Sequence, residues 1–307
     1  MIKVFIVIPA YNGWRQTRLC LESMQKSTYT NFEVIVVDHG STDNTKSELQ
    51  LEFPEVIRVI GSEKLWWSGA TNLGIKEALK RGADAVMLLN NDCFLEPDTI
   101  EKLVNRLKQI KGEAIIAPVQ CDASTGKVLV ITARTALLIG FPTFLATRNI
   151  SAAKKKAHNG LVETKLIAGG RGVLIPASIF KRIGLLDDES LPHYYADHDF
   201  YIRCRKSGIP LFIATDTKVF IDQEKTSLAQ SPGILTFRQF LETFKNRRSH
   251  RDIQQLSPLF KKHYPIPGCY FIGLGLNILR YVISYLIHRG IYLIQAESFS
   301  KTNHKSI

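Results

Sequence analysis

The sequence predicts an α/β protein with a doubly wound, mostly parallel central sheet flanked by helices, followed by a helical C-terminal extension. Three observations support this fold class. Apolar runs of strand length alternate with helical patterns over residues 4–110, and the runs hold almost no polar residue. Continuous apolar strands separated by helices indicate a parallel sheet covered on both faces. Residues 265–294 then form a second apolar stretch, which is too long for a strand.

The pattern assigns the elements in order. In the first part of the chain the expected strands are 4–8, 32–37, 57–60 and 85–89, and the expected helices are 15–27, 42–52, 70–81 and 97–110. Further on, the expected strands are 115–119, 127–131, 169–175 and 211–213, and the expected helices are 177–183 and 197–207. An irregular stretch is expected up to about Thr164, with Lys154, Lys155 and Lys156 in a solvated loop. We expect two domains, residues 1–225 and residues 226–307.

Charge and cysteine content exclude several classes of protein. The net charge of +12 is uneven, because residues 226–307 hold eleven Lys and Arg against three Asp and Glu. A basic tail suits an anionic membrane surface or a phosphorylated substrate. The sequence has no helix-turn-helix, zinc-finger or RNP-like pattern, so we expect no nucleic-acid partner. Five cysteines without a CxxC pair favour a reducing, cytoplasmic compartment.

Small polar residues follow three of the predicted strands. The first strand is followed by Pro9-Ala10-Tyr11-Asn12, the second by Asp38-His39-Gly40-Ser41, and the fourth by Asn90-Asn91-Asp92. Each group alone is ordinary turn chemistry. In an open parallel sheet, however, ligands bind outside the carboxyl ends of the strands. Three polar strand ends at one edge therefore predict a binding site.

The usual phosphate-binding signatures are missing from this site. The sequence contains neither a GxGxxG fingerprint after the first strand nor a GxxxxGK[ST] loop. Bound phosphates would then need another counter-charge. A divalent cation held by Asp92 is the candidate, because Mg²⁺ and Mn²⁺ favour oxygen ligands shared with substrate phosphates.

Four ordered motifs carry a family resemblance. The segments VIPAYN, VVDHGSTDNT, LLNND and YYADHDFYIRCRKSG, within residues 2–225, resemble the family 2 glycosyltransferases, which are inverting enzymes with the GT-A fold. The segment LWWSGATNLGI is similar to the N-x-G segment of bacterial members that build surface polysaccharides. The resemblance implies an inverting, metal-dependent transferase with a nucleoside-diphosphate sugar donor.

The resemblance also implies a donor site. The residues it places on the nucleotide or donor are Pro9, Tyr11, Asn12, Asp38, Asn72 and Asn91. Asp38 can accept a hydrogen bond from the imide N–H of uracil or thymine, which favours UDP or dTDP without settling the base. Asp92 stands at the last position of a DxD-like motif and would bind Mn²⁺ or Mg²⁺. Asp222, in VFIDQEKTS, stands where many relatives have a histidine and would be a second oxygen ligand.

The stretch around Asp197 resembles the E-D-x-D-[LF] motif of the family. Asp197 falls on the general base, which removes the acceptor hydroxyl's proton. Ala196 departs from the motif, because it replaces the first acidic residue. On the acceptor side the resemblance places Asp199, Trp67 and Arg171, of which Arg171 would pair with an acceptor diphosphate. Trp66 and Trp67 suit either a sugar face or the core, and His198 is expected to be structural or to face the acceptor.

The hypothesis is therefore a glycosyltransferase of bacterial cell-surface polysaccharide synthesis, acting on a glycan or a polyprenyl-diphosphate-linked acceptor. The alternatives are a nucleotidyltransferase, which would be expected to carry a glycine-rich loop after the first strand, and a non-catalytic nucleotide-sugar-binding relative. Ala196 and the missing histidine leave the second alternative open.

The C-terminal apolar stretch approaches the length of a membrane span, but Asn277, Arg280, His288 and Arg289 interrupt it. A basic amphipathic helix at the surface of an anionic membrane fits this pattern. The alternative is a helix that packs on the protein's own core or in a homodimer interface. The amphipathic membrane-surface helix predicts a peripheral enzyme on the inner face of the cytoplasmic membrane.

Overall fold

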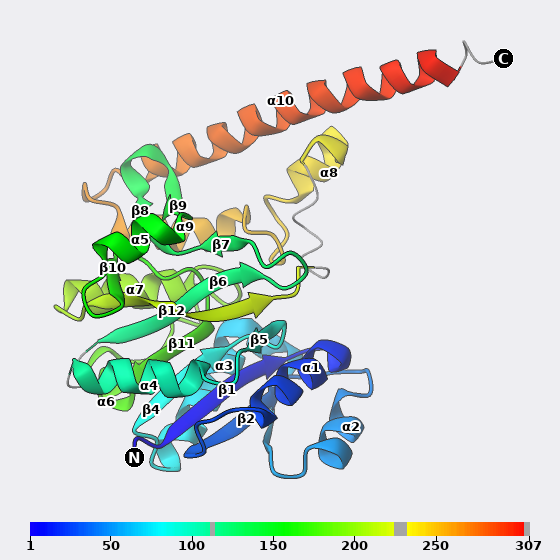
Figure 1. Cartoon of the computed structure of the whole chain (residues 1–307). Coiled ribbons are helices and arrows are strands. Elements are labelled where there is room, and N and C mark those ends of the chain that lie inside the picture. The colour runs from blue at the N-terminus through cyan, green and yellow to red at the C-terminus, as the bar shows by residue number, and fades with distance from the viewer. Residues whose placement is uncertain (111–113, 224–231, 304–307) are drawn as a thin grey trace. The chain divides into compact units, whose positions relative to one another are not determined.

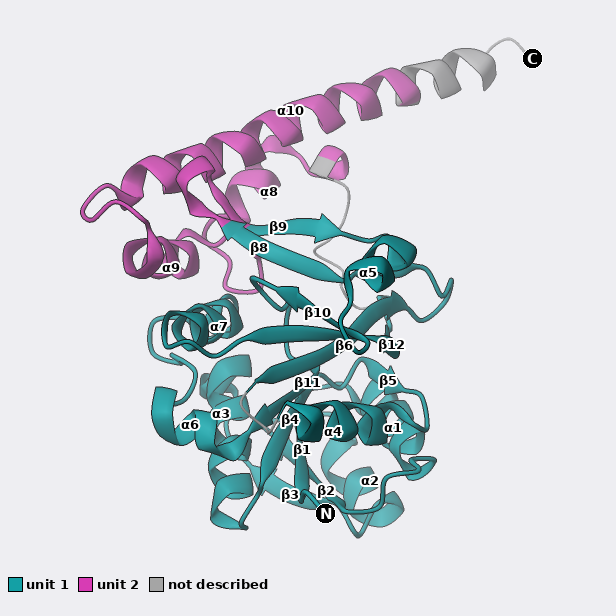
Figure 2. Cartoon of the chain, turned by 60° about the vertical axis from the view of Figure 1, so that its left-hand side comes forward, with its two compact units in different colours: residues 1–135, 143–223 teal, residues 136–142, 224–307 magenta. Residues whose placement is uncertain are grey.

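The computed structural model describes residues 1–110, 114–223 and 232–303 (Figure 1). The chain forms two compact units, of which unit 1 comprises residues 1–135 and 143–223, and unit 2 comprises residues 136–142 and 224–307 (Figure 2). Unit 2 therefore takes seven residues from the middle of the chain, in addition to the expected C-terminal extension. The sequence pattern does not indicate that residues 136–142 belong to unit 2.

The first half of unit 1 alternates strands with helices, as expected. Its elements are β1 (Val4–Ala10), α1 (Trp14–Gln25), β2 (Phe32–Asp38), α2 (Thr45–Glu52), β3 (Ile57–Ile60), η1 (Glu63–Leu65), α3 (Trp66–Lys80), β4 (Ala85–Leu89), β5 (Cys93–Leu95) and α4 (Thr99–Gln109). The later elements are β6 (Ile115–Asp122), β7 (Val128–Val130), β8 (Thr132–Ala136), η2 (Leu137–Ile139), β9 (Phe141–Thr147), α5 (Ile150–Lys156), β10 (Leu161–Thr164), β11 (Arg171–Pro176), α6 (Ala177–Ile183), α7 (Ala196–Lys206) and β12 (Leu211–Ile221).

The central sheet of the described residues has ten strands, with the order β10-β12-β6-β11-β4-β1-β2-β3 and with β5 and β7 at its side. The strands β4, β1, β2 and β3 are parallel to one another, and β6 is parallel to β12. Strand β11 lies between β4 and β6 and runs antiparallel to both. The predicted α/β class, with a helix-flanked sheet, is confirmed.

The helices cover both faces of the sheet because the strand side chains alternate. In β1, Val4, Ile6 and Ile8 lie in one apolar cluster with residues of α1, α2 and α4. On the opposite face, Val7 lies directly under Gly74 of α3. Helix α4 shows the expected spacing, because Ile100, Leu103, Val104 and Leu107 are all buried along one stripe.

The expectation of an irregular stretch before Thr164 is wrong. These residues form the β8–β9 hairpin, α5 and β10. The lysines 154–156 end helix α5, which Asn149 caps by accepting a hydrogen bond from Ala152 N at 3.0 Å. The helix buries only Ala153, so it leaves no apolar periodicity for a sequence pattern to reveal.

Unit 2 contains the hairpin tip and the C-terminal helices η4 (Pro232–Ile234), α8 (Phe237–Glu242), α9 (Ile253–His263) and α10 (Tyr270–Asn303). Phe240, Phe244 and Tyr285 form a small core, in which the rings of Phe240 and Tyr285 stack with centroids 4.2 Å apart. The hairpin tip joins the unit through Asn277, whose side-chain amide donates to Gly140 O at 2.6 Å. Among the described helices, α10 alone is long and apolar enough to cross a membrane, over Tyr270–Gln295.

The packing of α3 on the sheet makes a first prediction. A Cβ at residue 74 would collide with Val7 Cγ1 and lie 3.0 Å from Val37 Cγ2. We expect Gly74→Ala to lower the free energy of unfolding by about 1–3 kcal/mol, because the close-packed core cannot absorb the added methyl group. Urea unfolding followed by tryptophan fluorescence measures this, because Trp14, Trp66 and Trp67 all lie in unit 1.

The matched control is Lys76→Ala on the exposed side of the same helix, which should change stability by less than about 0.5 kcal/mol. Equal stability of the two variants would contradict the packing argument.

Candidate active site at the strand ends

Two of the three polar residues that follow β4, Asn90 and Asn91, have side-chain partners on neighbouring helices. Asn90 Oδ1 accepts a hydrogen bond from Trp67 Nε1 at 3.0 Å. Asn91 Nδ2 donates to Thr17 Oγ1 of α1 at 3.0 Å. Asp92 Oδ1 accepts a hydrogen bond from Cys93 Sγ at 3.4 Å. The predicted contact of Asn91 with the ribose or donor sugar stays a prediction, because its amide nitrogen already binds α1.

Asp92 and Asp222, the two predicted metal ligands, lie next to each other. Strand β5 pairs with the end of β12, and beyond this pairing Asp222 N donates to Asp92 O at 2.8 Å. Burial raises the pKa of the Asp92 carboxyl above its usual value, the Arg171 guanidinium opposes this, and the nearby Asp222 carboxylate adds to it. Two hard oxygen donors therefore meet at the edge of the sheet, in an environment that favours a cation.

The loop that leads into β11 joins the parts of the site. Gly169 N donates to Asp197 Oδ2 at 2.9 Å. Gly170 lies against Trp67, because a Cβ there would be 2.9 Å from Trp67 Cζ2. Arg171 influences Asp92, as described above, and its Nη1 donates to Gln120 Oε1 at 3.2 Å. Sequence analysis did not identify Gln120, a buried residue of β6 that holds this arginine.

The ends of β1 and β2 form the predicted nucleotide side. Ala10 and Asp38 are register partners, so the two strands end side by side. Asp38 is buried and accepts a hydrogen bond from Ser41 N at 3.0 Å. The Tyr11 ring stacks on His39, with centroids 5.4 Å apart. Sequence analysis did not assign a role to His39, whose imidazole stacks against the Tyr11 ring. Burial lowers the pKa of this imidazole.

Asn12 ties these two loops together. Its Oδ1 accepts hydrogen bonds from Thr42 N at 2.7 Å and Asp43 N at 3.2 Å, and its own N donates to Ser41 Oγ. It also adopts a left-handed backbone conformation, with φ of 48°. We therefore assign Asn12 to shaping the loops rather than to the direct nucleotide contact that the resemblance implies.

Asp197, the predicted general base, is buried at the start of α7. Its Oδ1 accepts from His198 Nδ1 at 2.9 Å, and its Oδ2 accepts from Gly169 N. Burial raises the pKa of Asp197, but His198 and the backbone N–H groups of His198 and Gly169 outweigh it, so the net pKa is lowered. The carboxylate is therefore ionised at neutral pH.

The predicted place of Asp199 on the acceptor side stays a prediction, and the structure shows this residue in an ion pair within the fold. Its side chain is buried and pairs with Arg203 Nε at 2.8 Å, one helical turn further along α7. Arg203 in turn donates to the carbonyls of Ile183 and Leu185. This ion pair fastens α7 to the end of α6.

Asn72 also makes hydrogen bonds within the fold, and its predicted contact with the donor stays a prediction. Its Nδ2 donates to Leu186 O at 2.9 Å, and its Oδ1 accepts from Leu186 N at 3.0 Å. The side chain is buried on α3, with both ends of the amide on one distant residue. Both polar atoms of the Asn72 side chain are therefore already hydrogen-bonded to Leu186.

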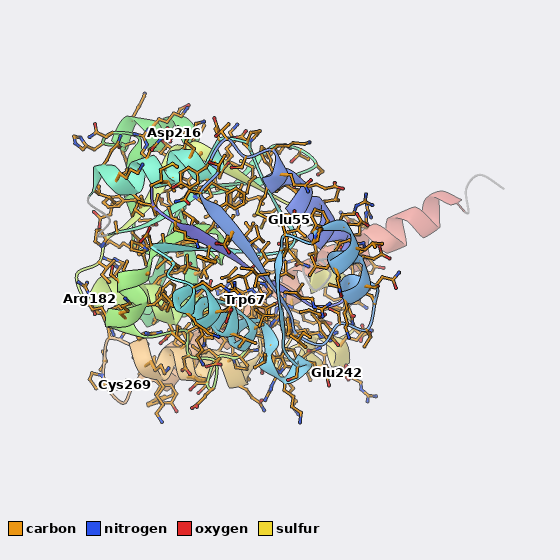
Figure 3. All side chains as sticks on the ribbon, turned by 90° about the horizontal axis from the view of Figure 1, so that it is seen from below. Glu55, Trp67, Arg182, Asp216, Glu242 and Cys269 are labelled. Carbon is orange, nitrogen blue, oxygen red and sulfur yellow. The ribbon has the colours of Figure 1, made fainter. Side chains whose placement is uncertain are left out.

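Aromatic residues line the site between α3 and α7. The Trp66 and His193 rings lie with centroids 5.6 Å apart, and His193 contacts Tyr194 at 4.6 Å. Trp66 and Tyr195 both adopt left-handed backbone conformations, with φ of 51° and 70°. Such strain in bulky residues clusters at functional sites. Trp67, which follows Trp66 on α3, is labelled in Figure 3.

Comparison with known proteins now decides the family. Residues 5–157 match the family model described as Glycosyl transferase family 2. The chain belongs to this family. An uncharacterized glycosyltransferase of Rickettsia typhi is 30% identical over 201 residues, which cover 65% of this chain and 58% of that protein. The chain therefore spans little more than half the length of this family 2 relative.

Two other comparisons place the fold and a functional neighbour. The UDP-N-acetylglucosamine–dolichyl-phosphate N-acetylglucosaminyltransferase of Methanococcus voltae is 27% identical over 158 residues, covering 46% of this chain and 62% of that protein. The crystal structure of GalNAc-T7 with UDP, GalNAc and Mn²⁺ superposes with a TM-score of 0.61 at 13% identity, covering 87% of this chain and 59% of that one. At this identity the likeness shows the fold, and the predicted GT-A type is confirmed.

The residues present fit a divalent cation that shares its ligands with a diphosphate. Among the residues that the structure describes, no group of three or more His, Cys, Asp and Glu side chains gathers around one point. Asp92 and Asp222 supply two carboxylates, and Mg²⁺ and Mn²⁺ commonly take the remaining oxygens from phosphates and water. The proximity of the two carboxylates, whose residues are joined by the hydrogen bond from Asp222 N to Asp92 O at 2.8 Å, is the observation that favours such a cation.

The assignment of Asn72 makes a prediction. We expect Asn72→Leu to lower the free energy of unfolding by about 1–3 kcal/mol, because it leaves Leu186 N–H buried without its acceptor and leaves Leu186 C=O with Asp188 N as its donor. Urea unfolding by tryptophan fluorescence measures the change, with Lys76→Ala on the same helix as the control. Unchanged stability together with weakened UDP binding would restore the donor role.

Proposed function

We propose that this family 2 member transfers a sugar, with inversion at the anomeric carbon, from a nucleoside-diphosphate sugar to a hydroxyl group of a glycan or of a polyprenyl-diphosphate-linked acceptor. One observation carries the proposal. The loop 169–171 contacts Asp197 and Trp67 and brings Arg171 to Asp92. A carboxylate suited to accept a proton and a charged centre suited to a diphosphate therefore belong to one site. We assign this chemistry to residues 1–225.

The donor side of the proposal places the nucleotide at the ends of β1 and β2. Tyr11, supported by His39, offers a ring on which a base can stack. Asp38 offers a carboxylate oxygen for the imide N–H of uracil or thymine, so UDP or dTDP is favoured. Pro9 and Asn91 border this space from β1 and from the end of β4.

The diphosphate would then reach Asp92, Asp222 and Arg171. Asp92 and Asp222 would hold a divalent cation, which would supply charge neutralisation to the diphosphate. Arg171 adds a fixed positive charge beside Asp92, and its Nε is buried without a hydrogen-bond partner among the described residues. A phosphate oxygen satisfies such a donor well.

In the transfer step, Asp197 accepts the proton of the acceptor hydroxyl. The freed oxygen pair forms the bond to the anomeric carbon, while the bond from that carbon to the diphosphate oxygen breaks with its electron pair on the diphosphate. No second acid is required, because the diphosphate is a good leaving group. The lowered pKa of Asp197 keeps it in the form that can take the proton.

Two similar proteins support this choice of substrates. The M. voltae relative is named for UDP-N-acetylglucosamine and dolichyl phosphate, and the GalNAc-T7 structure holds UDP, GalNAc and Mn²⁺. A UDP-sugar donor, a lipid-linked acceptor and Mn²⁺ therefore each have a precedent among similar proteins. Synthesis of bacterial cell-surface polysaccharide remains the pathway we propose.

The function is tested through Asp92. We expect UDP to raise the melting temperature of the wild-type protein, more strongly with Mn²⁺ than with EDTA, because a ligand that binds only the folded state stabilises it. Asp92→Asn should remove the Mn²⁺-dependent part of the shift and the release of UDP from UDP-sugars. The control is Glu163→Gln, which changes an exposed carboxylate on β10.

A wild-type protein that binds UDP and Mn²⁺ but releases no UDP or dTDP from any donor would be a nucleotide-sugar-binding relative. Full Mn²⁺ dependence in Asp92→Asn would place the cation elsewhere.

We further propose that residues 226–307 bind the enzyme peripherally to the inner face of the cytoplasmic membrane. Helix α10 packs Tyr285 and Asn277 into unit 2 but exposes Leu279, Ile283 and Leu286, which follow one another at intervals of four and three residues. This spacing makes a continuous apolar stripe on the outer side of the helix. The exposed Lys261 and Lys262 precede it and suit an anionic lipid surface.

Vesicle flotation tests this location. We expect the full chain to float with vesicles that contain phosphatidylglycerol, and less so with phosphatidylcholine vesicles or at high salt, because each basic residue near an anionic surface contributes about 1 kcal/mol. Replacing Leu279, Ile283 and Leu286 together by Asp should abolish flotation. Leu51→Asp, at a more exposed apolar position on α2, should not abolish it.

Failure of the full chain to float with anionic vesicles at low salt would contradict the proposal. A dimer that sediments as such, and that the triple variant dissociates, would instead assign the stripe to a homodimer interface.

A further inference from the structure

A chain of hydrogen bonds runs from Asp197 to the β8–β9 hairpin. His198 Nδ1 lies 2.9 Å from Asp197 Oδ1, and His198 Nε2 lies 2.7 Å from Thr143 Oγ1. All three residues belong to unit 1, and the Asp197 and His198 side chains are buried. Consecutive residues of a helix do not normally face each other. The contact between Asp197 and His198 is therefore a specific feature of this helix start.

We propose that His198 is a positioning residue for the transfer reaction, which fixes the carboxylate of Asp197 by donating Nδ1–H to it while Thr143 holds the other ring nitrogen. The inference rests on the proposed function, in which Asp197 accepts the acceptor's proton. It assigns His198 a role in the reaction, in place of the structural or acceptor-facing role expected from the sequence.

The hydrogen-bond partners determine the histidine tautomer. Asp197 is ionised and can only accept, so Nδ1 must carry a proton. In the neutral ring Nε2 then carries a lone pair, which accepts the Thr143 hydroxyl proton. Gly169 N–H binds the second carboxylate oxygen from the opposite side. The Asp197 carboxylate is thus held by a hydrogen bond at each oxygen. Neither donor, the His198 ring nor the Gly169 N–H, gives up its proton in the proposed reaction.

Electrostatics make this support necessary. Burial raises the pKa of Asp197, and His198 is foremost among the groups that lower it. The other titratable group against this carboxylate is Tyr201, whose hydroxyl donates to Gly169 O at 3.1 Å and which carries no charge near neutral pH. Without the His198 side chain, the backbone N–H groups of residues 198 and 169 would compensate only part of the desolvation of the carboxylate. Its pKa would then rise, and the unprotonated fraction at a given acidic pH would fall.

Two substitutions of His198 test the roles of its two ring nitrogens separately. An asparagine amide nitrogen occupies the place of Nδ1, whereas a glutamine amide nitrogen occupies the place of Nε2. His198→Asn therefore keeps the donor to Asp197 and loses the bond to Thr143. His198→Gln keeps a group near Thr143 and loses the donor to Asp197. His158→Asn, in the turn before β10, is the control.

The measurement is the release of UDP or dTDP from a panel of UDP- and dTDP-sugars across pH, with donor binding followed by thermal shift. We expect His198→Gln to reduce kcat by about tenfold to hundredfold with donor binding intact, because a loosened base loses its orientation. The acidic limb of its pH profile should also move to higher pH, by about one unit or more. His198→Asn should retain most of the wild-type kcat and its acidic limb.

A structural role would give a different pattern. If His198 only filled space or held the hairpin, His198→Gln would be no worse than His198→Asn and neither would shift the acidic limb, which would overturn the proposal. Thr143→Val supplies a further comparison, because it removes the hydroxyl but keeps the shape. We expect it to lower kcat less than His198→Gln does.

Nuclear magnetic resonance of the histidine ring nitrogens gives a readout that needs no turnover. With His198 assigned by its loss in His198→Asn, we expect its Nδ1 to be protonated at every pH where the protein is folded. A neutral ring with its proton on Nε2 would overturn the proposal. A wild-type protein that turns over no donor refutes the proposed function, whereas an active one with a wild-type-like His198→Gln refutes only the role of His198.

Discussion

The direction of β11 is the constraint on which the site depends. This strand runs antiparallel between β4 and β6, so it begins where β4 ends, with Arg171 opposite Leu89. A parallel strand in the same place would begin at the opposite edge of the sheet. Because of this reversal, the loop before β11 passes directly over the carboxyl ends of the neighbouring strands. Glycine at 169 and 170 then allows the backbone to approach Asp197 and Trp67 closely.

The buried carboxylates differ in how completely the protein compensates them. Asp199 has an arginine at 2.8 Å, and that arginine is itself bound to two carbonyls, so the pair is closed and structural. Asp197 is held by a backbone N–H and an imidazole, which keep its pKa low. At Asp92 burial raises the pKa despite Arg171, so charge compensation is incomplete. This graded compensation agrees with the three roles that we propose for these aspartates, namely a structural ion pair at Asp199, a proton acceptor at Asp197 and a cation ligand at Asp92.

The sequence predicts the elements whose periodicity is strong and the strand ends that follow them. The polar ends of β1, β2 and β4 do lie at one edge, because parallel pairing leaves little choice. The sequence alone could not show which asparagine side chains face a ligand and which bind within the fold. Asn72 binds Leu186, 114 residues away, and Asn12 binds the loop after β2, so both partners depend on the tertiary fold. His198 gave no signal of its own, since its role follows from a bond to its neighbour and another to residue 143, within a stretch without periodicity.

Helix α10 shows how a small core can leave a second apolar surface. The most apolar 18-residue window within the segment Tyr270–Gln295 has a mean hydropathy of 1.5, yet only 17% of it is buried. At 1.5 Å per residue this segment is about 39 Å long. Its inner side meets the rings of Phe240 and Phe244, and Arg280 lies between the rings of Phe141 and Tyr281, so the charged group is shielded on that side. The outer side keeps its apolar stripe without an arginine inside it.

An exposed apolar stripe of this kind on a helix in water is normally covered by another surface. The cationic residues that flank this stripe favour an anionic lipid surface over a second apolar protein face, because like charges would meet across a symmetric dimer.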